Sequence, residues 1–251
     1  MLEDDAMRSG FGKGFQGPNV GLTAGFNFGF NRPDQLSTSG LMLHLDASNA
    51  LSYPGSGATW FDLATDPAVN NATLINTPTF STDKGGSFNF AKASSESATV
   101  SGTGLVPQTA YTKAVWFNLT DLVSDNNLVS SETGGHFMYF AGTNRLYSGH
   151  TNWAVFSAYP SSRTFSAGVW YFATLTFNTT DGMTLYVNGA FDSSYTANKA
   201  AHGGDGSVNI GRFGVGNFLN GNIAQVLTYN RSLTSTEVAD LFNITKGRFG
   251  I

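Results

Sequence analysis

The chain has no cysteine, few charged residues and no long apolar run. The lack of cysteine excludes disulfides, thiolate metal sites and cysteine nucleophiles. Asp, Glu, Lys and Arg make up 12% of the 251 residues, about half of the usual share, and the formal net charge is -4. This composition argues against long charged helices. A net acidic chain also lacks the basic surface that sequence-independent nucleic-acid binding requires, so we expect no nucleic-acid partner.

The N-terminal residues and the apolar runs give no sign of a targeting segment. Residues 1–5 are acidic, and no apolar run of about 7–15 residues follows, so the first thirty residues do not resemble an export signal. No stretch approaches the roughly 18 apolar residues of a membrane helix. We therefore expect a soluble chain, made in a cytoplasm or supplied as a mature fragment, with no membrane partner.

Small polar residues and aromatic residues dominate what is present. The chain contains 25 Ser, 27 Thr, 22 Asn and 30 Gly, so hydroxyls and amides must solvate much of its surface in place of ions. The hydrophobic share of 41%, with 21 Phe, 9 Tyr and 4 Trp, is sufficient for a proper core. The length suits one large β domain with an appendage.

The first 38 residues differ from the rest. Glycine is so dense there that both helix and regular strand are disfavoured, because ordering glycine costs extra backbone entropy. The segment is nevertheless too apolar for a simple solvated linker. We expect residues 1–38 to form an extended Gly/Phe-rich arm that docks on a partner, with a disordered tail as the alternative. Its anchors would be five phenylalanines: Phe11, Phe15, Phe26, Phe28 and Phe30.

From residue 39 to the C-terminus the pattern is that of a β domain. Over residues 171–178 every second residue belongs to an apolar set, which is the period of a strand. The pattern continues over residues 183–187 after the Asp181-Gly182 turn, and the Asn188-Gly189 turn ends it. Residues 223–229 are apolar on both faces, as is typical of a strand that is covered on each side. Short strands and turn signals at this spacing indicate a β-sandwich or jelly roll.

One helix is expected near the C-terminus. Thr234 and Glu237 fit the T-x-x-E capping box, in which each side chain bonds the backbone N–H of the other residue. Val238, Leu241 and Phe242 follow at the spacing of one helix face, and we expect Gly247 to stop the helix.

Several segments, each weak alone, occur in an order that is typical of one family. They are residues 45–49 (LDASN), 52–57 (SYPGSG), 59–63 (TWFDL), 77–80 (TPTF), 85–88 (GGSF), 168–171 (GVWY), 185–189 (LYVNG), 209–211 (NIG), 219–226 (LNGNIAQV), 229–233 (YNRSL) and 237–238 (EV). Together they resemble a laminin-G-like domain of the concanavalin A-like lectin/glucanase superfamily, of the type found in bacteriophage virion proteins. The resemblance covers about residues 40–251 and implies an all-β jelly-roll sandwich of two antiparallel sheets, with a short C-terminal helix that caps one edge. Together with the Gly/Phe-rich arm, which lies outside the resemblance, we expect two domains: the arm, residues 1–38, and the sandwich, residues 39–251.

The resemblance also implies a calcium site, because such relatives often hold Ca²⁺ at the sandwich rim with carboxylate, amide and backbone oxygens. The candidate ligands are loop residues: Asp62, Asp66, Asn70, Asn126 and Asp205. The alternative for loop residues of this kind is a structural role, in which a carboxylate such as that of Asp62 accepts N–H bonds of the surrounding loop. We expect no other cofactor.

A catalytic role is disfavoured by the placement of the carboxylates. Retaining glycosidases hold two carboxyl groups about 5–5.5 Å apart, which on a strand requires acids at i and i+2 or i+4. The four glutamates do not meet this condition: Glu3, Glu96, Glu132 and Glu237. No nucleophile elbow or paired metal-binding histidines occur either. We expect no catalytic residues and a chain that is not an enzyme, with a divergent glycoside hydrolase as a minor alternative.

Sugar binding is the other property that the resemblance implies. Exposed aromatic rings with amide or hydroxyl neighbours are needed for it, and the segment around residues 147–159 has that composition. Its candidate glycan contacts are His150, Trp153 and Tyr159, although core packing explains Trp153 equally well.

These observations lead to a main hypothesis and an alternative. The main one is a non-enzymatic structural protein of a virion, a capsid decoration or attachment module that displays a lectin-like sandwich and is anchored by its arm to other virion proteins of the capsid or tail. Large aromatic anchors suit such docking, and we expect a homo-oligomer or symmetric assembly. The alternative is a carbohydrate-binding adhesin or tail-fibre component that recognises a host-surface glycan.

Overall fold

The computed structural model describes residues 36–64, 70–100, 102–122, 125–132, 134–152, 156–197, 199–204 and 206–251. All of these belong to one unit of the chain, residues 33–251. The five phenylalanines of the expected arm lie outside the described residues, so the arm stays a prediction: Phe11, Phe15, Phe26, Phe28 and Phe30.

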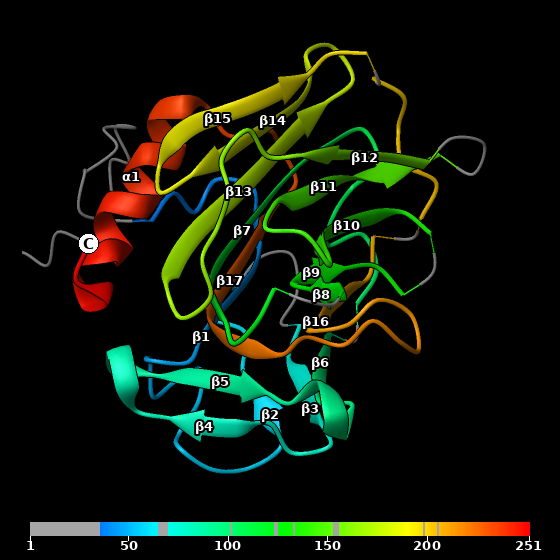
Figure 1. The fold of residues 1–251 in the computed structure, drawn as a ribbon. Coiled ribbons are helices and arrows are strands. Elements are labelled where there is room, and N and C mark those ends of the chain that lie inside the picture. The colour runs from blue at the N-terminus through cyan, green and yellow to red at the C-terminus, as the bar shows by residue number, and fades with distance from the viewer. Residues whose placement is uncertain are drawn as a thin grey trace, which may run out of the picture. The chain divides into compact units, whose positions relative to one another are not determined.

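Eight antiparallel strands form the first sheet (Figure 1). In spatial order they are β15 (Ala190–Tyr195), β14 (Gly182–Val187), β13 (Trp170–Asn178), β7 (Ala110–Leu119), β17 (Gly221–Tyr229), β5 (Ser87–Phe90) and β4 (Thr79–Ser81), while β1 (Leu41–Asp46) also pairs with β17. Asn188 and Gly189 join β14 to β15 with φ of 52° and 74°. Positive φ at both central residues is the geometry that an Asn-Gly hairpin favours, so this predicted turn is confirmed.

The remaining strands form a second sheet of five strands and a third of four. The second sheet runs β2 (Thr59–Trp60), β3 (Ala72–Ile75), β6 (Ser97–Val100), β16 (Val208–Ile210) and β9 (Val129–Ser130). The third runs β12 (Phe156–Pro160), β11 (Leu146–Thr151), β10 (His136–Ala141) and β8 (Asp125–Asn127). Only Leu128 separates β8 from β9, and its N–H donates to the carbonyl of Met138 on β10, 2.9 Å away. Residues 125–130 therefore link the second and third sheets.

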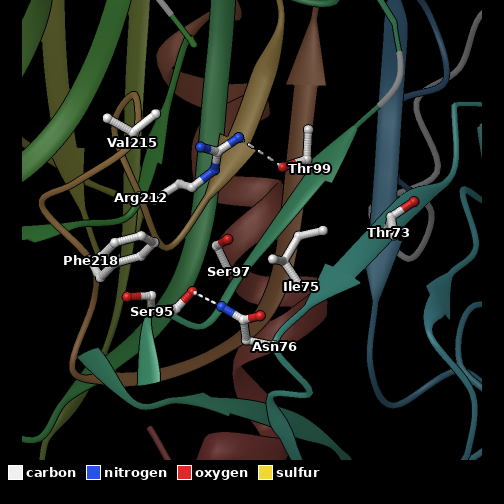
Figure 2. Close-up of a pocket in the computed structure, with 9 residues that line it drawn as sticks. All are labelled: Thr73, Ile75, Asn76, Ser95, Ser97, Thr99, Arg212, Val215 and Phe218. Atoms are coloured by element: carbon white, nitrogen blue, oxygen red, sulfur yellow. Dashed lines mark hydrogen bonds between the residues drawn. The ribbon is translucent and has the colours of Figure 1, made fainter. Parts of the chain in front are cut away.

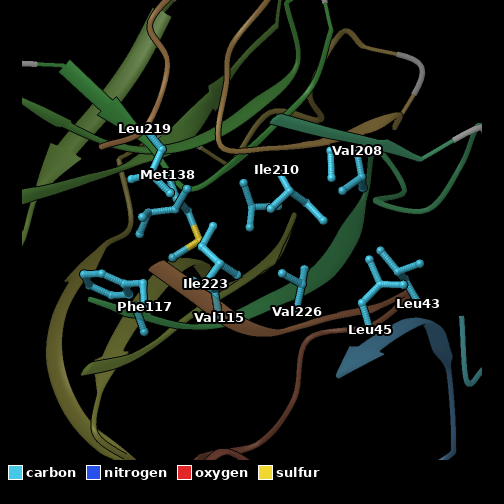
Figure 3. Packing of buried hydrophobic residues seen from close by; sticks show 14 of the residues in the cluster. Leu43, Leu45, Val115, Phe117, Met138, Val208, Ile210, Leu219, Ile223 and Val226 are labelled. Atoms are coloured by element: carbon cyan, nitrogen blue, oxygen red, sulfur yellow. The ribbon is translucent and has the colours of Figure 1, made fainter. Parts of the chain in front are cut away.

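The main hydrophobic core lies between the first sheet and the other two (Figure 3). Val115 and Phe117 of β7 face inward and are fully buried, as are Val208 and Ile210 of β16. Met138 of β10 packs into the same cluster. Alternate residues of each strand meet in this layer, because successive side chains of a strand point to opposite faces. The expected all-β sandwich is confirmed, with its second layer divided into two sheets.

A second core lies between the first sheet and the C-terminal helix α1 (Ser235–Thr245). Thr234 caps the helix, and Glu237 completes the capping box, as the sequence predicts. Trp116 of β7 is fully buried here and stacks on Phe249, with ring centroids 3.8 Å apart. The helix thus covers the outer face of the first sheet, which explains why β17 is buried on both faces.

Short helices complete the described structure: η1 (Asp83–Gly85), η2 (Lys92–Ser94) and η3 (Lys246–Phe249). The prediction that Gly247 stops the C-terminal helix is wrong, because α1 ends at Thr245 and Gly247 lies inside η3, which is followed by the left-handed residue Gly250. Among the residues that the structure describes, no helix is both long and apolar enough to cross a bilayer.

Candidate functional site

A groove of about 540 Å³ lies on the outer face of the second sheet (Figure 2). Strands β3 and β6, the residue that follows η2 and the loop after β16 provide its walls. The lining is mostly neutral and polar, with three apolar side chains: Thr73, Ile75, Asn76, Ser95, Ser97, Thr99, Arg212, Val215 and Phe218.

Strand pairing places a row of polar side chains across this face. Thr73 of β3 lies opposite Thr99 of β6, Thr99 lies opposite Asn209 of β16, and Asn209 lies opposite Ser130 of β9. The inward neighbours of Thr73, Thr99 and Asn209 are buried and apolar, so the alternation of each strand sends its polar residue outward. The groove therefore has a floor of hydrogen-bonding groups held on rigid strands.

Arg212 is the cation of the groove, and several groups fix its guanidinium. Its Nη2 donates to Glu132 Oε2 at 2.7 Å, to Asn209 Oδ1 at 3.2 Å and to Thr99 Oγ1 at 3.2 Å, and its Nη1 donates to the carbonyl of Gly214. Asn209 Nδ2 also donates to Glu132 Oε2, at 2.6 Å. The Arg212 side chain is 16% exposed and that of Glu132 is 42% exposed, so the carboxylate is the more accessible partner of this ion pair.

The apolar part of the groove comes mainly from the loop of residues 211–219. Figure 2 shows Val215 and Phe218 on the wall that faces Thr73 and Ile75. Val215 is 91% exposed and Ile75 is 36% exposed, while Phe218 is half-buried. Concave sites with apolar or aromatic walls and a few placed polar groups are typical of ligand pockets.

Two hydrogen-bonding atoms of the groove have no partner among the described residues. They are Ser97 Oγ and Arg212 Nε, and both are buried. Asn76, by contrast, is held in place, because its Nδ2 donates to the carbonyls of Ser94 and Ser95 at 3.2 and 3.1 Å. Ser97 Oγ and Arg212 Nε are enclosed by the protein, so a ligand in the groove does not reach them directly.

A smaller pocket of about 170 Å³ lies on the other side of loop 211–219. Its lining combines aromatic rings with a carboxylate and amides: Asp125, Asn127, Phe137, Tyr139, Phe213 and Asn217. Tyr139 stacks on Tyr147 with ring centroids 5.6 Å apart. Burial, with Tyr147 and Asp125 nearby, raises the pKa of the Tyr139 hydroxyl. One loop thus contributes to two pockets. The groove is lined by its residues Arg212, Val215 and Phe218, and the smaller pocket is lined by Phe213 and Asn217.

Of the glycan contacts expected from the sequence, His150 and Tyr159 do not line either pocket. His150 is fully buried, with Nδ1 3.1 Å from the Tyr111 hydroxyl, and burial lowers its pKa to about 4. A glycan on the surface does not reach such a side chain, so the structure assigns His150 to the core. Tyr159 is half-buried and stacks on Tyr195 at 4.2 Å. Trp153 lies outside the described residues, and its role stays a prediction.

The carboxylate of Asp62 accepts hydrogen bonds from backbone N–H groups. Its Oδ1 accepts the N–H groups of His44 and Ala64 at 2.8 and 2.9 Å, and its Oδ2 accepts that of Asn70 at 3.0 Å. Burial raises its pKa, against the effect of these bonds. The alternative of a structural role therefore holds for this residue.

The other calcium candidates form no cluster that the structure describes. Asn126 is buried, and its Oδ1 accepts the N–H of Asn220 at 2.7 Å. Asp66 and Asp205 lie outside the described residues. Within the described ranges, no group of three or more His, Asp or Glu side chains is arranged to hold a metal ion.

Sequence reasoning missed the groove itself. Thr73, Thr99 and Arg212 look unremarkable in a chain with so many hydroxyl residues, and Glu132 drew attention only as a carboxylate without an acidic neighbour. The available signal was the alternation of β3 and β6, which puts hydroxyls on one face, but the sequence does not show that these strands are neighbours.

A comparison with protein families matches residues 91–239 to a model described as the concanavalin A-like lectin/glucanases superfamily. The match covers more than half of the chain. The chain belongs to this superfamily. Most of the groove and of the smaller pocket, including Arg212 and Phe218, lies within the matched residues of the superfamily domain, as does Glu132, the ion-pair partner of Arg212.

Solved structures with the same lectin-like fold include toxin and sialidase chains. The binding domain of botulinum neurotoxin DC, in complex with SialylT, has a TM-score of 0.64 at 12% identity, over 83% of this chain and 52% of that chain. Botulinum neurotoxin type C, which interacts with two ganglioside molecules, has a TM-score of 0.63 at 12% identity, over 82% and 51%. Trypanosoma rangeli sialidase, in complex with the inhibitor DANA, has a TM-score of 0.59 at 16% identity, over 82% and 33%.

At these identities the likeness concerns the fold alone. The chain spans about half the length of the neurotoxin chains and a third of the sialidase chain. A search of curated proteins gives no match.

Proposed function

We propose that this chain is a glycan-binding module and that the sugar lies in the groove on the outer face of the second sheet. The observation that carries the proposal is the lining: hydroxyls and an amide stand on the floor, and the half-buried ring of Phe218 stands on the wall. A sugar presents hydroxyls on its edges and C–H groups on its faces, so it needs both kinds of contact.

Two further observations support a sugar over a purely apolar ligand. Thr73 and Thr99 line the groove with hydroxyls that can both donate and accept. The neurotoxin binding domains with the same fold bind SialylT and interact with gangliosides, which shows that proteins containing this architecture recognise glycans.

The test is glycan-array binding followed by calorimetry with the best ligand. We expect Phe218→Ala to weaken binding at least tenfold, since loss of a central aromatic hot-spot contact costs about 2 kcal/mol or more and about 1.4 kcal/mol corresponds to tenfold. Phe191→Ala is the matched control, because Phe191 is a phenylalanine of β15 that is 62% exposed and does not line the groove. Equal binding by the two variants would place the sugar elsewhere, and no binding by the wild type would reject the function.

The location of the module in a virion and its lack of catalysis are proposals that rest on the sequence. Display on a particle agrees with glycan binding, because an adhesin or tail-fibre component presents its lectin-like domain to a host surface. A non-catalytic role is supported by the spacing of the glutamates, none of which has the second acid on a strand that hydrolysis by a carboxylate pair needs.

A further inference from the structure

The charge of the groove is balanced within the protein. Arg212 is the only cation among the described residues that line the groove and the smaller pocket. Its Nη2 already donates to the carboxylate of Glu132 at 2.7 Å, and Asn209 holds that carboxylate from a second side at 2.6 Å. The positive charge is therefore neutralised where a ligand would meet it.

This arrangement leaves little of the guanidinium for an anionic ligand. An arginine binds a carboxylate most strongly through two parallel N–H groups. In Arg212 the Nη1 group donates to the Gly214 carbonyl, and Nη2 is shared among Glu132, Asn209 and Thr99. Of the guanidinium nitrogens, only Nε has no protein acceptor, and it is buried.

Negative charge, in contrast, remains accessible on this face. The Glu132 side chain is 42% exposed beside the groove. Asp125 contributes a second carboxylate to the smaller pocket across loop 211–219. A sugar with a carboxylate or sulfate would meet like charge on both sides of the loop, and in a partly desolvated groove that repulsion is stronger than in bulk water.

We propose that Glu132 makes the groove selective for uncharged sugars, such as hexose and N-acetylhexosamine units, and excludes sialylated, sulfated or uronic acid residues. The inference rests on the proposed glycan function and concerns the same groove. Glu132 acts in two ways: it occupies the Nη2 group of Arg212 that would otherwise receive an acidic sugar, and it repels the charge of that sugar.

The experiment uses a glycan array in which each neutral glycan is paired with its sialylated, sulfated or uronic acid counterpart. We expect the full-length wild type to bind the neutral members at least tenfold more tightly than their acidic partners. Glu132→Gln keeps the size of the side chain and an acceptor oxygen for Arg212 but removes the charge. We expect it to raise the acidic-to-neutral binding ratio at least tenfold.

Asp192→Asn is the matched control. Asp192 lies on β15, forms an ion pair with Arg163 at 3.1 Å and does not line either pocket.

A second readout needs no variant. Raising the salt from 0.05 to about 0.5 M should reduce the wild-type preference for neutral over acidic glycans, since salt screens the repulsion of partly exposed charges. Equal or tighter wild-type binding of acidic members, or an unchanged ratio in Glu132→Gln, would overturn the selectivity while leaving glycan binding intact. A wild type that binds no glycan on the array would overturn the proposed function and the selectivity with it.

Discussion

Single side chains in this chain often satisfy the backbone where the sequence suggests a ligand site. Asp62 is such a residue, because three backbone N–H groups use its carboxylate. His150 is similar: its type and neighbours resemble a sugar contact, yet its ring packs edge-on against Phe177 at 4.5 Å in the core. Residue type alone does not separate these roles, because burial decides between them and burial is a property of the fold.

Asp62 gives a direct test at this scale. Asp62→Asn replaces one acceptor oxygen by an NH₂ group that faces a backbone donor, so we expect the free energy of unfolding to fall by about 1–3 kcal/mol. Denaturant unfolding in EDTA and in millimolar calcium would measure it. We expect the same loss in both buffers. A loss that occurs only in calcium would support a metal site at Asp62 instead.

At the scale of elements, local sequence patterns predict the strands and the helix, whereas the pairing of the strands decides which side chains form a site. The strand over residues 171–178, the Asn188-Gly189 turn and the capping box of α1 all occur as expected, because each depends on residues close together in the chain. The groove depends on β3, β6 and β16, which come from distant parts of the sequence. Their order in the sheet could not be read from the local pattern.

Strands β7, β10 and β11 also bring together a buried group of bases. Lys113 is fully buried, and its Nζ lies 3.2 Å from His136 Nδ1, while His136 Nε2 lies 2.9 Å from the Ser207 carbonyl. The Nε2 group must donate to that carbonyl, so Nδ1 of a neutral His136 accepts from the amine. The rings of His150 and His202 lie 6.0 Å apart in the same cluster. Burial lowers the pKa of the Lys113 amine and of both the His136 and His150 rings.

These shifts make stability depend on pH in a defined direction. The unfolded chain takes up protons below pH 6.5 at each histidine, whereas folded His150 does so only near pH 4. The contribution of His150 to the free energy of unfolding is therefore fully present above about pH 6.5, and it is lost as the pH falls towards 4. For Lys113, the unfolded amine binds a proton below pH 10.5 and the folded amine does not until a much lower pH. Its contribution therefore declines as the pH falls below 10.5.

Lys113→Met tests this account by removing one such base with little change in volume. We expect the slope of unfolding free energy against pH, measured between pH 8 and 9.5, to decrease by about 1.4 kcal/mol per pH unit, the value for one proton. Lys199→Met, at an exposed position, is the control and should leave the slope unchanged. An unchanged slope in Lys113→Met would mean that the amine stays charged in the folded protein.

On the scale of the whole molecule, the question is how the module is attached. The sequence predicts an arm over residues 1–38, and the structure shows that Leu36 packs against the core beside α1 and that Ser37 Oγ accepts from Arg231 at 3.1 Å. A deletion that probes the arm must therefore spare these residues and stop at residue 32, before the unit of residues 33–251 begins.

On the proposed virion role, we expect the protein without residues 1–32 to fold and to keep its glycan affinity, but to lose its attachment to virions. Circular dichroism, glycan binding and occupancy on purified particles would measure these three properties. Full occupancy of the shortened protein on particles would contradict anchoring by Phe11, Phe15, Phe26, Phe28 and Phe30.

By itself the sequence determined the β class, the turns, the capped helix and the resemblance to a lectin-like family, because these follow from composition and from patterns within a few residues. Only the tertiary structure decided which polar residues form a site. Strand pairing brings Thr73, Thr99 and Asn209 into one row, and the loop after β16 sets Arg212 against Glu132. The physical reason is that a site on a sheet is built across strands, whereas a sequence records order only along them.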